Sequence, residues 1–327
     1  MSTDTQPDAE VIPCRVCASP VFDDELFCEA CGTPVAGESP PAPAAVPSQA
    51  AGRQERDLGV IAAVTDRGKR RHRNEDAMAI AAVNDRFVAV VCDGVASTAN
   101  PHLAARAAAD ATLAVLEPLL HAPRWPEAAP LGDLLAEAFA EAQAAVTLVS
   151  DDEPDGNDLS PSTTLVAAVV TTDGIVVGSV GDSRAYWLSP TTGHSRTLTM
   201  DDSWAQDSIA EGVAPEVAYA HPEAHTITRW IGSDTDSAEP AVVAAGVSEP
   251  GLLVLCTDGL WNYFEDAERL AALIPFGAAT PIDTARMLTD AALAAGGQDN
   301  ITVAVIPVDP TLAPSVAGPE EGELHRG

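Results

Sequence analysis

The chain has 327 residues and a formal charge of −32 at neutral pH, from 17 basic and 49 acidic residues. A surface with such an excess of carboxylates repels nucleic acid and anionic membranes, so neither is an expected partner. No apolar run approaches the roughly 18 residues of a transmembrane helix, and the polar, acidic N-terminus is unlike a secretory signal, so a cytoplasmic location is expected. Aromatic residues make up only 4% of the sequence, which predicts a core of small aliphatic side chains.

Four of the six cysteines lie near the N-terminus, with the spacing Cys14-x2-Cys17-x10-Cys28-x2-Cys31. Two Cys-x-x-Cys pairs supply four thiolates that can close a tetrahedral zinc site, and four protein ligands leave no open position for catalysis. Residues 1–35 are therefore predicted to be a zinc ribbon that holds one structural Zn²⁺ and docks the chain to a partner. Redox or disulfide chemistry is the alternative for these cysteines.

Residues 36–57 are rich in Pro and Ala and predict a semi-extended linker. A new pattern starts at residue 58 and continues to residue 308, which predicts one large domain. Residues 309–327 contain Pro, Gly and Glu and predict a disordered acidic tail.

The predicted elements of this domain come as groups of strands and pairs of helices. Strands joined by hairpin signals favour antiparallel sheets covered by helices over a βαβ alternation. The expected strands are 58–65, 77–83, 87–92, 163–171, 174–181, 184–188, 241–247, 252–257 and 301–306, and the expected helices are 102–120, 130–149, 203–211, 265–273 and 281–295.

Three apolar segments, each typical of a buried strand, end in an aspartate: Asp93, Asp182 and Asp258. Further carboxylates stand at predicted strand ends: Glu75, Asp76 and Asp299. A single Asp-Gly pair is an ordinary turn signal, but carboxylates delivered by several strand ends can form one site. Ligand sets made only of oxygen favour Mg²⁺ or Mn²⁺ over zinc, and a water held between two such ions can attack phosphorus.

Together and in this order, these segments resemble the metal-dependent protein phosphatase family, the type 2C Ser/Thr phosphatases. The resemblance covers about residues 58–308. It is carried by Thr65-Asp-Arg-Gly-x5-Asn-Glu-Asp-Ala77, Val91-Cys-Asp-Gly94, Ser162-Thr-Thr-Leu165, Val180-Gly-Asp-Ser-Arg-Ala-Tyr186, Leu198-Thr-x-Asp-x-Ser203, Ile227-Thr-Arg-Trp-Ile-Gly232, Cys256-Thr-Asp-Gly-Leu-Trp261 and Gln298-Asp-Asn-Ile-Thr-Val303.

The resemblance implies an α+β fold in which two packed antiparallel sheets, a β-sandwich, are flanked by pairs of α-helices, here preceded by the small zinc ribbon. It also implies a catalytic centre with two Mg²⁺ or Mn²⁺ ions, at which Asp93 bridges both and Arg71 binds the phosphate. Asp258 and Asp299 would complete the coordination of the first metal. The second metal would be coordinated by the Gly94 carbonyl with Glu75 and Asp76, and Asp182 would supply a weaker third site.

Three positions depart from the family. Residues 95–101 replace its usual glycine-rich loop, Asn262 stands where an Asp commonly contacts the third metal, and Asp202 stands where His is common. None of the ligands implied for the first two metals is lost, so activity remains the expectation.

The expected function is hydrolysis of phosphoserine and phosphothreonine in proteins by a metal-activated water. The family implies phosphorylated proteins as partners, including a Ser/Thr kinase and its substrates, and a monomeric enzyme is expected. The alternative is a weakly active or inactive regulatory module that keeps the phosphatase fold, binds a phosphoprotein and docks through its zinc ribbon.

Overall fold

The computed structural model describes residues 11–13, 20–22, 52–122, 128–151, 160–171, 174–235 and 238–310. The tail 311–327 lies outside the described residues, and so do the predicted zinc ligands Cys14, Cys17, Cys28 and Cys31. Strands β1 (Val11–Pro13) and β2 (Pro20–Phe22), which precede and follow the first Cys-x-x-Cys pair in the sequence, form an antiparallel pair.

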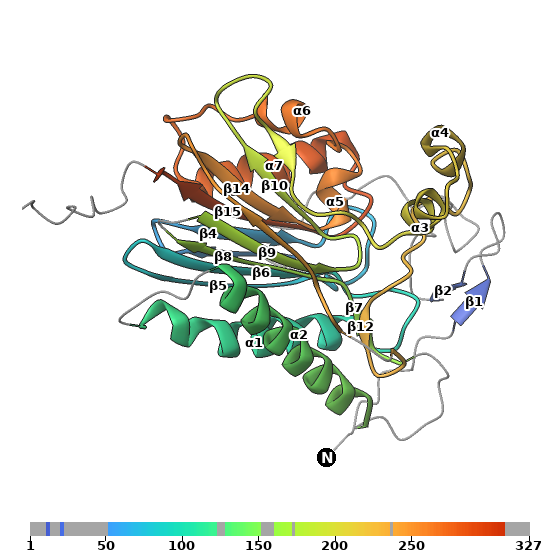
Figure 1. The fold of residues 1–327 in the computed structure, drawn as a ribbon. Coiled ribbons are helices and arrows are strands. Elements are labelled where there is room, and N and C mark those ends of the chain that lie inside the picture. Colours follow the sequence, from blue (N-terminus) through green and yellow to red (C-terminus); the bar gives the residue numbers. More distant parts are fainter. Residues whose placement is uncertain are drawn as a thin grey trace, which may run out of the picture.

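Two antiparallel sheets form the body of the molecule (Figure 1). The six-stranded sheet has the order β11 (Arg196–Thr197), β10 (Arg184–Leu188), β14 (Gly251–Cys256), β15 (Ile301–Val308), β4 (Ala62–Asp66) and β3 (Arg53–Asp57). The five-stranded sheet has the order β13 (Ala241–Ala245), β9 (Gly174–Val180), β8 (Leu165–Thr171), β6 (Arg86–Cys92) and β5 (Ala77–Val83). A short pair, β12 (Ile231–Gly232) and β7 (Ser162–Thr163), lies beside them.

The central strands are apolar throughout because both of their faces are covered. In β6, Val88 and Val90 face the helices, while Ala89 and Val91 face the other sheet, as the two-residue period of a strand requires. The buried layer between the sheets is built of small aliphatic side chains, with few aromatic rings. This arrangement explains why strands of the sandwich read as continuous apolar runs in the sequence.

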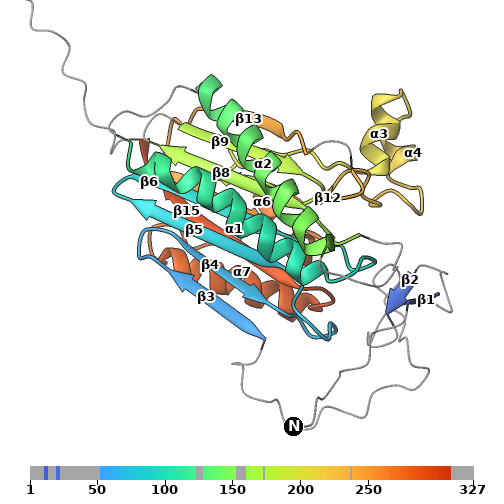
Figure 2. The same cartoon turned by 90° about the horizontal axis from the view of Figure 1, so that it is seen from below.

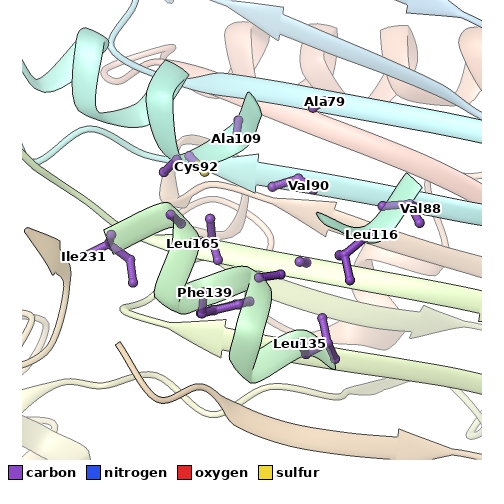
Figure 3. Close-up of a cluster of buried hydrophobic side chains, with 14 of the residues drawn as sticks. Ala79, Val88, Val90, Cys92, Ala109, Leu116, Leu135, Phe139, Leu165 and Ile231 are labelled. Carbon is purple, nitrogen blue, oxygen red and sulfur yellow. The ribbon is translucent and has the colours of Figure 1, made fainter. Parts of the chain in front are cut away.

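Helices cover both outer faces of the sandwich (Figures 1 and 2). The five-stranded sheet is covered by α1 (Pro101–Leu120) and α2 (Ala128–Asp151). Leu116 of α1 and Phe139 of α2 belong to the same buried cluster as Val88 and Val90 of β6, which Figure 3 shows between the helices and the sheet. The six-stranded sheet is covered by α7 (Pro281–Ala295) with the short helices α5 (Asp258–Trp261) and α6 (Ala267–Ala271). The predicted α+β sandwich flanked by helices is therefore confirmed.

The six-stranded sheet begins inside the segment predicted to be a linker. Strand β3 pairs with β4 along its whole length, and most of its side chains are exposed. Ion pairs bind it to α7: Arg53 Nη1 lies 2.7 Å from Asp290 Oδ1, and Arg286 Nη2 lies 2.6 Å from Glu55 Oε2. A polar edge strand held by main-chain hydrogen bonds and ion pairs has no apolar alternation, so the boundary predicted at residue 58 was wrong by about one strand.

Residues 202–229 leave the body as a separate excursion, which we call the α3–α4 segment (Figure 1). It contains α3 (Trp204–Ala210) and α4 (Pro215–Ala218). None of the helices in the described ranges combines the length and apolar character needed to cross a bilayer.

Candidate metal centre

Strand register brings the predicted carboxylates to one edge of the sandwich. In the five-stranded sheet Ala77 lies opposite Cys92, so Asp76 and Asp93 leave the ladder side by side. In the six-stranded sheet Cys256 lies opposite Val303, which places Asp258 and Asp299 at the same edge. Asp182 follows β9 at this edge. The structure thus gathers carboxylates that lie up to 223 residues apart in the chain.

The carboxylates are close enough for their charges to interact. Burial, followed by repulsion from Asp76 and Asp258, raises the pKa of Asp93 well above its usual range. Burial, followed by repulsion from Asp299 and Asp182, does the same to the pKa of Asp258. The pKa values of Asp76 and Asp182 rise to about 7, in both cases mainly because of burial. A cluster of this kind is stabilised by any cation that enters it.

Two carboxylate oxygens of the cluster are buried without a hydrogen-bond partner in the described part of the chain: Asp76 Oδ1 and Asp258 Oδ1. The other oxygen of Asp76 is firmly held, because it accepts from Thr257 Oγ1 at 3.0 Å and from Thr302 Oγ1 at 2.7 Å. Buried acceptors without partners are rare and costly. Mg²⁺ and Mn²⁺ are hard cations that bind carboxylate oxygens, so these two oxygens are suitable ligands for such an ion.

Protein donors hold other oxygens of the cluster. Arg71 donates to both oxygens of Asp299, from Nε at 2.9 Å and from Nη2 at 2.7 Å, and the side chains are only 9% and 23% exposed. Asn262 Nδ2 donates to Asp258 Oδ2 at 3.0 Å. As the described side chains stand, no three from His, Cys, Asp and Glu are placed to share one ion. A metal ion would therefore compete with Arg71 for Asp299.

Gly94 occupies a place where only glycine fits. A Cβ atom built there would lie 2.6 Å from the carbonyl oxygen of Pro101 and 2.8 Å from that of Glu75. The Gly94 N–H donates to the Glu75 carbonyl at 3.3 Å. Glycine is thus required by the close approach of three backbone segments, in addition to the access to its carbonyl that a metal would need.

Asn300 is a structural residue of the site that the sequence reasoning did not identify. Its buried side chain accepts from the Glu75 N–H at 2.8 Å and donates to the carbonyls of Arg67 and Arg73 at 2.8 and 2.9 Å. It therefore fixes the loop that carries Arg71. The available signal was its place directly after a predicted metal ligand, in the stretch Gln298-Asp-Asn.

Replacing Asn300 by Ala is expected to lower the free energy of unfolding by about 2–3 kcal/mol, because three partly buried hydrogen bonds to the backbone are lost. Urea denaturation of the variant and the wild type measures this. Gln298→Ala is the matched control: the residue is exposed, and its removal should change stability by less than about 0.5 kcal/mol. Equal stability of both variants would contradict the role of Asn300.

The loop that departs from the family, residues 95–101, is held by hydrogen bonds within itself and to β7. Val95 N–H donates to the Ser162 carbonyl at 2.9 Å, and Thr98 Oγ1 donates to the Val95 carbonyl at 2.6 Å. Asn100 adopts a left-handed conformation with φ of 46° immediately before α1 begins at Pro101. The altered sequence therefore still forms an ordered connection between Asp93 and the start of α1.

Comparisons with known proteins agree with this architecture. The sequence model of the family described as protein phosphatase 2C matches residues 65–294. The serine/threonine protein phosphatase PstP of Mycobacterium tuberculosis is 32% identical over 273 residues, which cover 80% of this chain and 48% of that protein. The serine/threonine phosphatase stp of Listeria innocua is 29% identical over 250 residues, covering 74% of this chain and 93% of that protein.

A solved relative supports the same assignment. The crystal structure of the PPM Ser-Thr phosphatase MsPP from Mycobacterium smegmatis, in complex with cacodylate, is 30% identical with a TM-score of 0.58, over 75% of this chain and 97% of that one. The present chain spans about half the length of the mycobacterial PstP. Because the family model matches well over half of the sequence, the chain belongs to the protein phosphatase 2C family.

Proposed function

We propose that the chain is a divalent-metal-dependent phosphatase that hydrolyses phosphoserine and phosphothreonine in proteins. The observation that carries the proposal is the cluster of interacting carboxylates, with two unpartnered buried oxygens and an arginine beside it. The relatives named as Ser/Thr phosphatases support it.

The residues that would hold the ions are those implied by the family. Asp93 would bridge the two ions, and Asp258 and Asp299 would complete the first of them. The second would be held by Gly94, Glu75 and Asp76, and a weaker third by Asp182. Bound Mg²⁺ or Mn²⁺ would supply the charge that activates an attacking water and neutralises the phosphoryl oxygens.

Arg71 would bind the phosphate. Its guanidinium now makes a two-pronged contact with Asp299, and the same fork matches two oxygens of a phosphoryl group. Once Asp299 turned to a metal, the guanidinium of Arg71 would still lie at the same edge of the sandwich, where a phosphoryl group would replace the carboxylate as its partner. The related MsPP forms a complex with cacodylate, which is a tetrahedral oxyanion as phosphate is, and this supports oxyanion binding by the present chain.

For the N-terminal segment we propose one structural Zn²⁺ on Cys14, Cys17, Cys28 and Cys31, and a docking role toward a partner. The spacing of the cysteines supports this. Zinc analysis of the full chain should find one ion, which is lost when Cys14 and Cys17 are replaced by Ser. An unchanged zinc content would contradict the ribbon.

Phosphorylated proteins, among them a Ser/Thr kinase and its substrates, are the proposed partners of a monomeric, cytoplasmic enzyme.

The experiment that tests the function compares peptides carrying phosphothreonine, phosphoserine or phosphotyrosine, with Mn²⁺ present. We expect phosphate release from the first two and much less from the third. The second candidate, a module that binds phosphoproteins without turnover, is favoured by the donors that already occupy the oxygens of Asp299 and Asp258. Binding of the phosphopeptides without any release would support that module and contradict the phosphatase.

A further inference from the structure

The α3–α4 segment has a small core of its own. Ala205, Ala218 and Ala224 are buried against one another, and Trp204 stacks on His221 with ring centroids 4.0 Å apart. Ser203 and Ile227 form an isolated bridge where the segment leaves and returns. The position of the whole excursion therefore depends on how its two ends are attached to the body.

Asp202 makes four hydrogen bonds at this attachment. Its N–H donates to the Gly181 carbonyl at 2.9 Å, and its Oδ2 accepts from the Gly181 N–H at 2.9 Å. Its carbonyl accepts from the Thr228 N–H at 2.9 Å, and its Oδ1 accepts from Arg229 Nη1 at 3.0 Å. A single residue thus joins the outgoing end, the returning end and the body.

The anchor on the body is rigid and adjoins the metal centre. Gly181 has a φ of +96°, and a Cβ atom there would lie 2.7 Å from side-chain atoms of Thr164, so the Gly181 backbone lies directly against the Thr164 side chain. Thr164 in turn bonds Asp93 in both directions: its N–H donates to the Asp93 carbonyl at 2.8 Å, and its Oγ1 accepts from the Asp93 N–H at 3.1 Å. Gly181, which Asp202 holds, is therefore connected to Asp93 through a single residue, Thr164.

A second contact ties the segment to the same edge. The ring of His225 lies 6.0 Å from that of Trp261, and Trp261 Nε1 donates to the Asp182 carbonyl at 2.9 Å. The segment also carries exposed apolar side chains, Val217 at 61% and Tyr219 at 43% exposure, which are available to a polypeptide. A substrate protein that presents its phosphate to the metal centre would meet this surface.

We propose that Asp202 and Arg229 are a positioning pair that fixes the α3–α4 segment at the rim of the metal centre and so sets the affinity for phosphoprotein substrates. The pair acts through the segment and touches no reacting group. Arg229 strengthens the attachment because its Nη2 also donates to the Glu239 carbonyl, ahead of β13. The proposal rests on the proposed phosphatase function for its substrate.

The test uses Asp202→Asn, Arg229→Met and the double variant in the full chain. Asn keeps the size of Asp and can still accept from Gly181, so Asp202→Asn removes mainly the charged contact. The matched control is Arg286→Met, which removes an exposed ion pair with Glu55 far from the segment. Three quantities are measured: amide hydrogen exchange over residues 203–228, the Kd and KM for a phosphothreonine peptide, and kcat for a small aryl phosphate.

We expect exchange in the segment to become roughly three- to tenfold faster, and the peptide Kd and KM to rise by a similar factor, in both single variants. The double variant should be no worse than Arg229→Met alone, because that single variant already removes both the contact with Asp202 and the contact with Glu239. Turnover of the aryl phosphate should stay within about twofold of wild type, since the pair touches no reacting group. The control should match wild type throughout.

Unchanged exchange in all three variants would overturn the proposal, and so would faster exchange with an unchanged peptide Kd. An equal loss of turnover on the aryl phosphate and the peptide would also overturn it, because that pattern belongs to damage at the metal centre. If wild type itself releases no phosphate, the proposed function fails. The exchange rates and the peptide Kd would still decide the role of the pair.

Discussion

Replacing Asp93 by Asn is expected to lower Mn²⁺-dependent phosphate release from a phosphothreonine peptide by roughly three orders of magnitude or more, since charge stabilisation by the ions contributes several kcal/mol to such reactions. Asn keeps the shape of Asp and leaves the main-chain contacts to Thr164 in place. It removes the central charge of the cluster, which interacts with Asp76, Asp258, Asp299 and Asp182. The loss of phosphate release should therefore come from the hydrolysis step and not from a change in the fold.

Stability separates this loss from unfolding. Burial and neighbouring carboxylates raise the pKa of Asp93, so the Asn variant relieves repulsion in the metal-free chain and should be at least as stable as wild type. Asp290→Asn is the matched control, because Asp290 is 61% exposed and contacts Arg53 far from the centre. Steady-state kinetics and urea denaturation measure both effects. Full activity of Asp93→Asn would contradict the assignment of Asp93 as the bridging ligand.

The second large effect is a loss of stability of the metal-free chain as the pH rises from about 5 to 8, reversed by Mn²⁺. The folded chain raises the pKa values of Asp76 and Asp182 from their usual 3.8 to about 7. Between these values the folded state holds protons that the unfolded state has lost, so the stabilisation present at low pH disappears as the pH passes 7. The expected loss is on the order of a few kcal/mol.

Mn²⁺ binds ionised carboxylates, so its stabilising effect should be larger at pH 8 than at pH 5. Urea denaturation of the full chain at both pH values, after chelation and after addition of Mn²⁺, measures the effect. The lowered pKa of His102 acts with the opposite sign, and comparison with and without Mn²⁺ at each pH removes its contribution. A metal-free stability that is constant or rises over this range would contradict the carboxylate cluster.

The strands and long helices could be predicted because their signals are local. Strand Arg86–Cys92 is apolar on both faces and ends in Asp93, and helix Pro281–Ala295 begins with proline after a capping Thr280. The order of the Asp-bearing motifs placed their carboxylates at one site, and the structure gathers them at one edge of the sandwich.

The features that escaped prediction depend on contacts between distant residues. Strand β3 is polar and exposed, so nothing in its own sequence distinguishes it from a linker. The contact of Arg71 with Asp299 joins residues 228 positions apart, and the contacts of Asn300 reach equally far. The two contacts of Asp202 with Gly181, one from its backbone and one from its carboxylate, join residues 21 positions apart. Only the fold brings these groups together.

A titration of Mn²⁺ into the chelated full chain, with phosphate release from a phosphothreonine peptide as the readout, tests whether the carboxylate cluster supports metal-dependent hydrolysis. We expect no release before Mn²⁺ is added, a saturable rise as it is added, and no rise in the Asp93→Asn variant. Release that chelation leaves unchanged, or no release at any Mn²⁺ concentration, would contradict a metal-dependent phosphatase built on this carboxylate cluster.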